Sequence, residues 1–168
     1  MNPRMKILLL SVFAFLCLAG AALATDGFRL PGAVFRMDEL DQAQARAREK
    51  GKPIAFLYSD EHTTCGLCAR ASLQMIDELK MKCVLVYVDA RRNLVGYPPA
   101  VVQALHAPEG GQTIPKTVVL DAALERVLAY VPYARDDALD EILKQAKKTL
   151  ATAAPAHPSS RRLPPPGP

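Results

Sequence analysis

Two short apolar runs separated by a helical pattern constrain the fold of this chain most strongly. Ile54 to Tyr58 and Cys83 to Val88 are each long enough for a buried strand and too short for a helix. Between them, apolar residues recur every three or four positions, which predicts a helix that begins at or just before Cys65. The apolar face of this helix is expected to contain Ala69, Leu73, Ile76 and Leu79. A strand, a helix and a second strand within about 35 residues form a right-handed crossover, so the two strands should be parallel.

The segment before this unit predicts another helix. Residues 25–36 carry Gly and Pro among scattered apolar residues, which is typical of an irregular or short-strand lead-in. A helical pattern with Leu40, Ala43 and Ala47 on one face follows Asp38 and ends at Gly51.

The segment after this unit completes an α/β fold. A short helix is expected after Pro98-Pro99, and the runs Thr117 to Leu120 and Arg126 to Val131 predict an antiparallel hairpin. A final amphipathic helix begins near Asp136, where acidic residues suit the positive end of a helix. We therefore expect a central mixed sheet of four or five strands flanked by helices.

The composition suits one folded domain and excludes several classes of protein. Half of the 168 residues are apolar and 23% are charged, which is enough to bury one sizeable core and is not typical of a disordered chain. The chain has no Trp, five Phe and five Tyr, so it offers no stacking platform for nucleic-acid bases. Its formal charge of +4 falls to +2 without residues 1–24, and we expect no nucleic-acid partner.

The first 24 residues are typical of an export signal. Arg4 and Lys6 supply the positive charge, and Ile7 to Leu18 is an almost unbroken apolar stretch. Ala22-Leu23-Ala24 presents the small residues that a signal peptidase requires, so cleavage there would deliver the chain to the periplasm. An uncleaved membrane anchor is the alternative, because Ile7 to Leu23 reaches the lower limit of about 17 residues for a membrane span.

The mature chain is expected to be one domain, residues 25–152, followed by a Pro-rich tail, residues 153–168. Six of the last fourteen residues are Pro and no apolar period continues into them, which predicts a disordered tail. A binding motif for a partner that recognises polyproline is the alternative for this segment.

The mature chain keeps three cysteines, Cys65, Cys68 and Cys83, in a compartment that oxidises exposed thiols. At most one intramolecular disulfide can form among three, which excludes a small fold stapled by several disulfides. Cys83 opens an apolar strand and is interpreted as a small buried hydrophobic residue. A regulatory or resolving thiol is the alternative for Cys83.

The residues with the clearest chemistry are Cys65-Gly66-Leu67-Cys68, which follow a predicted strand and open a predicted helix. At a helix start, unpaired backbone N–H groups and the positive end of the helix dipole favour a thiolate, so the pKa of Cys65 should fall. Cys68 lies one turn further on and deeper, where it can attack a mixed disulfide formed on Cys65. Cys65 is therefore the expected nucleophile and Cys68 the expected resolving thiol.

Two other uses of this spacing stay open. Cysteines with two residues between them also suit half of a zinc site, which Cys83 and His62 would have to complete because the sequence has no second pair. We therefore expect no metal. A permanent structural disulfide is the other alternative, and it is disfavoured because so small a loop restricts the unfolded chain little.

The order of these motifs resembles that of the thioredoxin superfamily over roughly Met37 to Leu150. Lys52-Pro53 leads into the first buried strand, Cys65-Gly66-Leu67-Cys68 follows it, and Thr113-Ile114-Pro115 precedes a later strand. More narrowly, the Gly-Lys-Pro turn is similar to that of exported thioredoxin-like proteins. The resemblance implies a thioredoxin fold, a redox-active disulfide between the paired cysteines in place of a bound cofactor, and a cis Pro115 that faces them.

The turn at Pro115 has a consequence for substrate binding. A cis peptide bond is largely a property of proline, and such a turn would leave the backbone of Ile114 free to pair with a substrate peptide. We therefore expect Ile114 and Pro115 to bind substrate. A trans Pro115 that opens an edge strand is the alternative.

The chain departs from the family at three places. Thr64 stands where ordinary thioredoxins have a Trp, and Gly66-Leu67 replaces Gly-Pro between the cysteines. The strand Ile54 to Tyr58 lacks the buried acid that serves the family as proton acceptor for the second cysteine. Glu61 is a candidate to replace that acid, and His62, when protonated, is a candidate to stabilise the first thiolate. An exposed loop histidine without a catalytic part is the alternative for His62.

These observations predict a periplasmic thiol-disulfide oxidoreductase that exchanges disulfides with protein or small-thiol substrates. The resemblance gives a slight preference for a reductase, which would draw its electrons from a membrane donor. The alternative is a non-catalytic thioredoxin-like binding or assembly module for a periplasmic client, in which the cysteines are structural or vestigial. The missing buried acid and the altered residues between the cysteines favour this alternative modestly.

Overall fold

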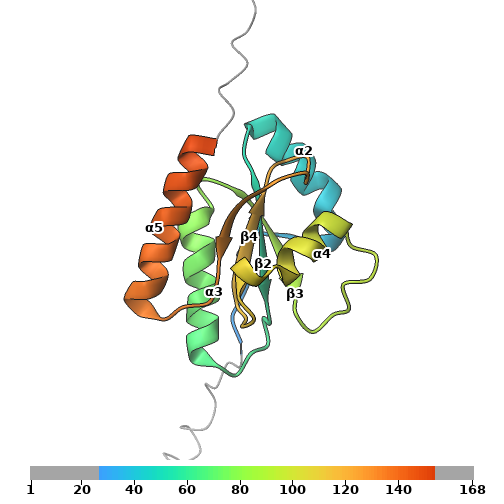
Figure 1. Cartoon of the computed structure of the whole chain (residues 1–168). Helices are drawn as coiled ribbons and strands as arrows, with labels where there is room; N and C mark the ends of the chain where they lie inside the picture. Colours follow the sequence, from blue (N-terminus) through green and yellow to red (C-terminus); the bar gives the residue numbers. More distant parts are fainter. Residues whose placement is uncertain (1–26, 154–168) are drawn as a thin grey trace, which may run out of the picture.

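The computed structural model describes residues 27–153. The predicted export signal, residues 1–24, and residues 154–168 of the predicted tail lie outside the described residues. Within the described part, five strands form one mixed sheet in the order β1-β3-β2-β4-β5 (Figure 1). The strands are β1 (Phe35–Arg36), β2 (Ile54–Ser59), β3 (Val84–Asp89), β4 (Lys116–Leu120) and β5 (Val127–Val131).

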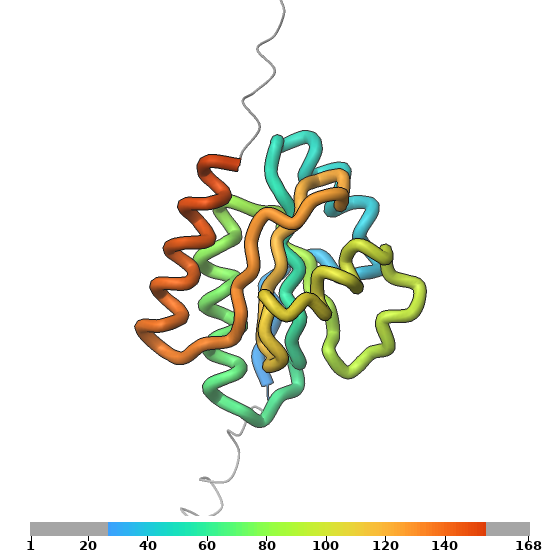
Figure 2. Tube along the Cα trace, in the orientation of Figure 1, coloured from blue at the N-terminus to red at the C-terminus, as the bar shows by residue number. Residues whose placement is uncertain are grey.

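Between residues 27 and 153, four α-helices cover the two faces of this sheet (Figures 1 and 2). One face carries α2 (Leu40–Lys50) and α4 (Pro99–His106), and the other carries α3 (Gly66–Leu79) and α5 (Asp136–Ala153). The sheet therefore separates two hydrophobic cores. No helix in this stretch is long and apolar enough to cross a bilayer.

The directions of the strands identify the fold. β3 runs parallel to both β1 and β2, whereas β4 is antiparallel to β2 and to β5. The segment β2–α3–β3 is therefore the predicted parallel crossover, and β4 with β5 is the predicted hairpin. Together with helices on both faces, this order and these directions are those of the thioredoxin fold, which confirms the predicted α/β class and architecture.

The sequence signals that shape α2 act as predicted. Leu40, Ala43 and Ala47 are buried against the sheet. Gly51 ends the helix in the left-handed conformation, with φ of 59°, and its N–H reaches back to the carbonyl of Ala47. A residue with a side chain adopts this conformation only at a cost, so the glycine directs the chain out of α2 and toward β2.

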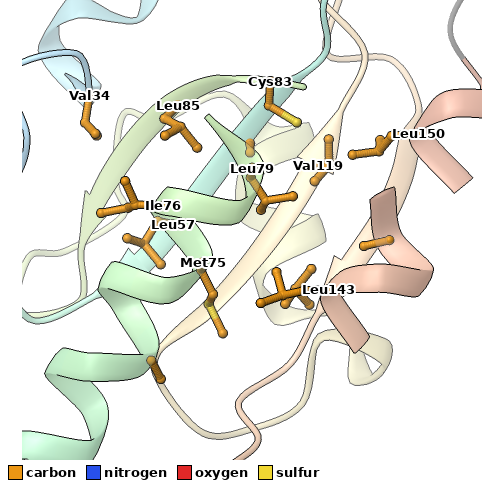
Figure 3. Packing of buried hydrophobic residues seen from close by; sticks show 14 of the residues in the cluster. Val34, Leu57, Met75, Ile76, Leu79, Cys83, Leu85, Val119, Leu143 and Leu150 are labelled. Atoms are coloured by element: carbon orange, nitrogen blue, oxygen red, sulfur yellow. The ribbon is translucent and has the colours of Figure 1, made fainter. Parts of the chain in front are cut away.

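The buried face of α3 differs from the predicted one. Met75, Ile76 and Leu79 lie in the core between the sheet and α5 (Figure 3), whereas Leu73 is 37% exposed. A repeat of apolar residues every three or four positions predicts a helix. It does not say which side of the helix packs on the sheet, and α3 has apolar residues on more than one side. The true face includes Ser72, whose buried hydroxyl is satisfied by hydrogen bonds inside the protein.

One edge of the sheet brings the motifs together. β2 and β3 run in register and both end at this edge, where Ser59 lies opposite Asp89. β4 is antiparallel and begins there, with Lys116 opposite Tyr58. The loop that leads from β2 to Cys65 and the turn that precedes β4 therefore meet at the same edge.

Candidate active site

The two cysteines of the motif lie at the first turn of α3. Cys65 is the N-cap residue, and the backbone N–H of Cys68 donates to Cys65 Sγ at 3.2 Å. The N–H of Cys65 donates in turn to Thr63 Oγ1 at 3.2 Å. Both sulfurs are free thiols, Cys65 exposed and Cys68 half-buried. One helical turn therefore holds an exposed thiol and a more buried one side by side.

The environment of Cys65 favours its thiolate. The pKa of Cys65 is lowered, first by a hydrogen bond from the Cys68 thiol and then by the backbone N–H of Cys68. The backbone N–H of Leu67 and the positive charge of Arg135 act in the same direction. These groups stabilise a negative sulfur at a helix start, as the sequence predicts.

The environment of Cys68 has the opposite effect. Burial raises the pKa of Cys68 to about 11, and the hydrogen bond to Cys65 and the negative charge of that sulfur add to the rise. The positive charge of Arg135 opposes it. Cys65 therefore loses its proton before Cys68 does, and the more exposed thiol is the one that becomes nucleophilic.

Glu61 anchors the loop that leads into the motif. Its N–H donates to the hydroxyl of Tyr87 at 2.9 Å, and that hydroxyl donates to the carbonyl of Ser59 at 2.8 Å. The carbonyl of Glu61 accepts a bond from the N–H of Phe28 at 3.0 Å. A Cβ on Gly27 would come within 2.0 Å of the same carbonyl oxygen, so only glycine fits there. The backbone before Cys65 is thus fixed by β3 on one side and by the lead-in on the other.

The side chains of Glu61 and His62 have partners other than the cysteines. The Glu61 carboxylate accepts two bonds from the guanidinium of Arg36, at 3.1 and 2.9 Å, in place of the expected contact with Cys68. The His62 side chain is 63% exposed, and its Nε2 lies 3.8 Å from Glu61 Oε1. Within the described residues, neither side chain is among the groups that shift the pKa of Cys65 or Cys68. The structure therefore gives Glu61 a role in holding the loop.

The turn before β4 lies at the same sheet edge as the cysteines. The Ile114–Pro115 peptide bond is cis, and Pro115 is buried. The next residue, Lys116, is also buried, and its Nζ donates to the carbonyl of Gly111 at 2.8 Å and lies 5.9 Å from the centre of the Tyr58 ring. Within residues 27–153, the backbone N–H and C=O of Ile114 make no hydrogen bond. These two groups are therefore available to a bound peptide.

A pair of buried hydroxyls beside the motif was not predicted from the sequence. Ser59 Oγ and Ser72 Oγ lie 2.8 Å apart, and Ser72 Oγ donates to the carbonyl of Cys68 at 2.9 Å. The pair fastens the first turns of α3 to the end of β2. The available signal was the spacing from Cys68 to Ser72, since a serine hydroxyl reaches back to the carbonyl four residues earlier in a helix. Arg135, in the loop between β5 and α5, also acts on the cysteines and was not predicted, because no local sequence pattern connects it to the motif.

Cys83 lies apart from the other two cysteines. It directly precedes β3, at the opposite end of that strand from the active-site edge, and its side chain lies in the core beside α3 (Figure 3). It is 4% exposed, and burial raises its pKa to about 12. The interpretation of Cys83 as a small buried hydrophobic residue is confirmed. In the described part of the chain, no three His, Cys, Asp or Glu side chains are grouped as metal ligands would be.

Comparison with known proteins gives structural neighbours only. No protein-family model matches the sequence, and no curated protein matches it. Thioredoxin O2 from Arabidopsis thaliana, in its oxidised state, has 15% sequence identity and a TM-score of 0.42, over 75% of this chain and 98% of that one. A DsbH oxidoreductase has 20% identity and a TM-score of 0.40, over 76% of this chain and 89% of that one. The fold assignment accordingly depends on the strand order and strand directions described above.

Proposed function

We propose that the protein is a thiol-disulfide oxidoreductase that acts on protein disulfides, with Cys65 as nucleophile and Cys68 as resolving thiol. One observation carries the proposal. Cys65 is an exposed thiol at the start of α3, and its pKa is lowered first by the hydrogen bond from the Cys68 thiol. A buried structural thiol has no such environment, as Cys83 illustrates with its raised pKa.

The exchange proceeds in two displacements. The Cys65 thiolate attacks one sulfur of the substrate disulfide, a mixed disulfide forms, and the other substrate sulfur leaves as a thiolate that takes a proton from water. Cys68 then loses its proton and attacks Cys65 Sγ, which releases the second substrate thiol. The substrate gains two electrons and two protons, and the protein is left with a Cys65–Cys68 disulfide.

The first displacement also prepares the second. In the mixed disulfide Cys65 carries no negative charge and offers no thiolate to the Cys68 proton, so two of the causes that raise the pKa of Cys68 are removed. Burial remains, and the positive charge of Arg135 then favours the new thiolate. Cys68 therefore becomes a better nucleophile at the stage where it is needed.

The substrate would lie along the turn before β4. Ile114 presents an N–H and a C=O that have no partner in the described part of the chain, at the sheet edge where α3 begins, and an extended peptide can pair with them as an additional strand. Pro115 follows directly and supports that backbone from a buried position. Binding of this kind uses main-chain atoms and so accepts substrates of varied sequence.

We further propose that the protein works in the periplasm as a reductase. The charged, apolar and small-residue segments within residues 1–24 support export. A reductase must be reduced again after each cycle, and a membrane donor of electrons would supply the two electrons to the Cys65–Cys68 disulfide.

The experiment is reduction of insulin by dithiothreitol, followed as turbidity. The native protein and a Cys83→Ala variant should accelerate the reaction equally, because Cys83 is buried away from the pair. A Cys65→Ser variant should be inactive, and a reduced Cys68→Ala variant mixed with insulin in the absence of dithiothreitol should stall as a mixed disulfide with the substrate. Equal, near-zero rates for the native protein and Cys65→Ser would overturn the proposal and leave a non-catalytic binding module for a periplasmic client.

A further inference from the structure

A shallow depression lies beside the cysteine motif, with Leu67 of Cys65-Gly66-Leu67-Cys68 in its lining. The loop between β5 and α5 passes beside α3 (Figure 1), and the two segments line the depression together. α3 contributes Leu67 and Arg70, and the loop contributes Tyr133 and Arg135. Leu67 stands between the cysteines in the sequence and is 42% exposed, so this surface is accessible next to the motif.

The charge of this surface is positive and unpaired. Arg36, Arg92 and Arg126 each lie near a carboxylate, at 2.9, 3.4 and 3.9 Å respectively. Within residues 27–153, Arg70 and Arg135 have no carboxylate within 4.0 Å. Asp136 is the one acidic residue among those that line the depression, so two guanidinium groups face one carboxylate.

The position of Arg135 connects this surface to the reacting sulfurs. Arg135 lines the same depression as Leu67, which stands between the two cysteines, and among residues 27–153 its positive charge acts on both Cys65 and Cys68. A substrate cysteine attacked by Cys65 brings its neighbouring residues to the same place. The residues beside that cysteine are therefore the ones that meet the two arginines.

We propose that the surface formed by Leu67, Arg70 and Arg135 selects substrate segments that carry a carboxylate beside the reactive cysteine. This inference rests on the proposed function of the cysteine pair and specifies its substrate class. A carboxylate can accept parallel hydrogen bonds from a guanidinium, which makes arginine well suited to this recognition. Two exposed ion pairs of this kind should raise the rate of exchange by about fivefold, and the effect should weaken with salt.

The test uses three peptides that differ only beside one central cysteine, where they carry Glu, Gln or Lys. In each peptide the cysteine is joined by a disulfide to the same small leaving thiol. Single-turnover rates are measured with the reduced protein at low and at high salt. A double variant, Arg70→Gln with Arg135→Gln, is compared with Arg126→Gln, which removes a guanidinium from the β4–β5 hairpin instead. Ratios between peptides cancel any change in the general reactivity of Cys65.

We expect the native protein and Arg126→Gln to favour the Glu peptide over the Gln peptide by about fivefold, and the Lys peptide to be slowest. For the double variant, the single-turnover rates with the three peptides should agree to within about twofold. The same should hold for the native protein at high salt. Equal rates for the three peptides with the native protein, or an unchanged preference in the double variant, would overturn this inference while the proposed function stands. If none of the peptides reacts, the proposed function fails and the inference falls with it.

Discussion

The largest causes that lower the pKa of the Cys65 thiol come from groups within one turn of helix. The first of them is the Cys68 thiol, which donates a hydrogen bond to the Cys65 sulfur, and the backbone N–H of Cys68 is the second. Because only the first depends on a side chain, substitution of Cys68 separates the two contributions.

Replacement of Cys68 by alanine should therefore raise the pKa of Cys65, whereas replacement by serine, which keeps a donor, should raise it less. The measurement is the rate of alkylation by iodoacetamide across a pH series, since only the thiolate reacts. In the native protein the rate should rise with pH through a midpoint below that of a free cysteine, about 8.5, because the folded state favours the charged form. A midpoint that is identical in all three proteins would contradict this cause.

Cys83 should be inert in the folded protein. It is 4% exposed and burial raises its pKa to about 12, so the thiolate is scarce and out of reach. In the reduced chain that starts at residue 25, which has three cysteines, a thiol reagent should count two reactive cysteines in the folded protein and one more after unfolding in urea. Rapid reaction of three thiols without denaturant would contradict the buried position of Cys83.

At the scale of residues, the sequence predicted the positions of side chains whose surroundings are local in the chain. Cys65 and Cys68 were identifiable because the start of a helix and a separation of three positions can both be recognised in the local sequence. Arg135 and Ser59 could not be identified in this way, because they come close to the motif only through the packing of the sheet and of α3. Glu61 was placed near the site but given the wrong partner, since Arg36 is distant in sequence.

The loop between β2 and α3 is the element that positions Cys65, the proposed nucleophile. Tyr87 in β3 holds it through one buried hydroxyl, which accepts from Glu61 N–H and donates to the Ser59 carbonyl. Burial raises the pKa of Tyr87, so the hydroxyl remains a donor at all physiological pH values.

Replacement of Tyr87 by phenylalanine should destabilise the reduced protein by about 1–3 kcal/mol, because the Glu61 N–H loses its acceptor in a partly buried site. The matched control is Tyr97→Phe, since the Tyr97 hydroxyl makes no side-chain hydrogen bond within the described residues. Urea unfolding gives both values. Equal stability of the two variants would show that the Tyr87 hydroxyl does not hold the loop.

The secondary structure was predicted well where the apolar repeat of a helix is followed directly by a residue that ends the helix. α2 is an example, because its apolar face and the glycine after it both lie within the same short segment. The buried face of α3 was predicted in part, with Ile76 and Leu79 buried and Leu73 exposed, because that face is selected by β2, β3 and α5, which are distant in the sequence. Local pattern therefore determined where the helices lie, and tertiary packing determined which side of α3 is buried.

The whole molecule is held by two cores on opposite faces of one sheet. The core between the sheet, α3 and α5 surrounds Leu143, which is 1% exposed (Figure 3). The parallel β2–α3–β3 crossover and the β4–β5 hairpin could be predicted because each is built from segments that are adjacent in the sequence, whereas the order of the five strands was not predicted. The distances between side chains at the active-site edge depend on the register of the strands, and they could not be predicted from the sequence.

Replacement of Leu143 by alanine should cost about 2–5 kcal/mol of unfolding free energy, because it leaves a cavity where α5 packs on the sheet. Replacement of Met81, which is 71% exposed, by alanine should change the free energy of unfolding by no more than about 0.5 kcal/mol. Thermal or urea unfolding measures both. A loss of similar size at the two positions would contradict the packing described for α5.

The proposed exchange requires that the Cys65–Cys68 pair cycle reversibly between dithiol and disulfide while Cys83 stays reduced. The most direct test is equilibration of the protein in buffers of graded glutathione ratio, followed by rapid alkylation and mass spectrometry of the peptides. The mechanism predicts a single two-electron transition that converts two thiols to one disulfide, Cys65 to Cys68, at every ratio where oxidation occurs. The absence of any disulfide across the series, or a disulfide that includes Cys83, would contradict it.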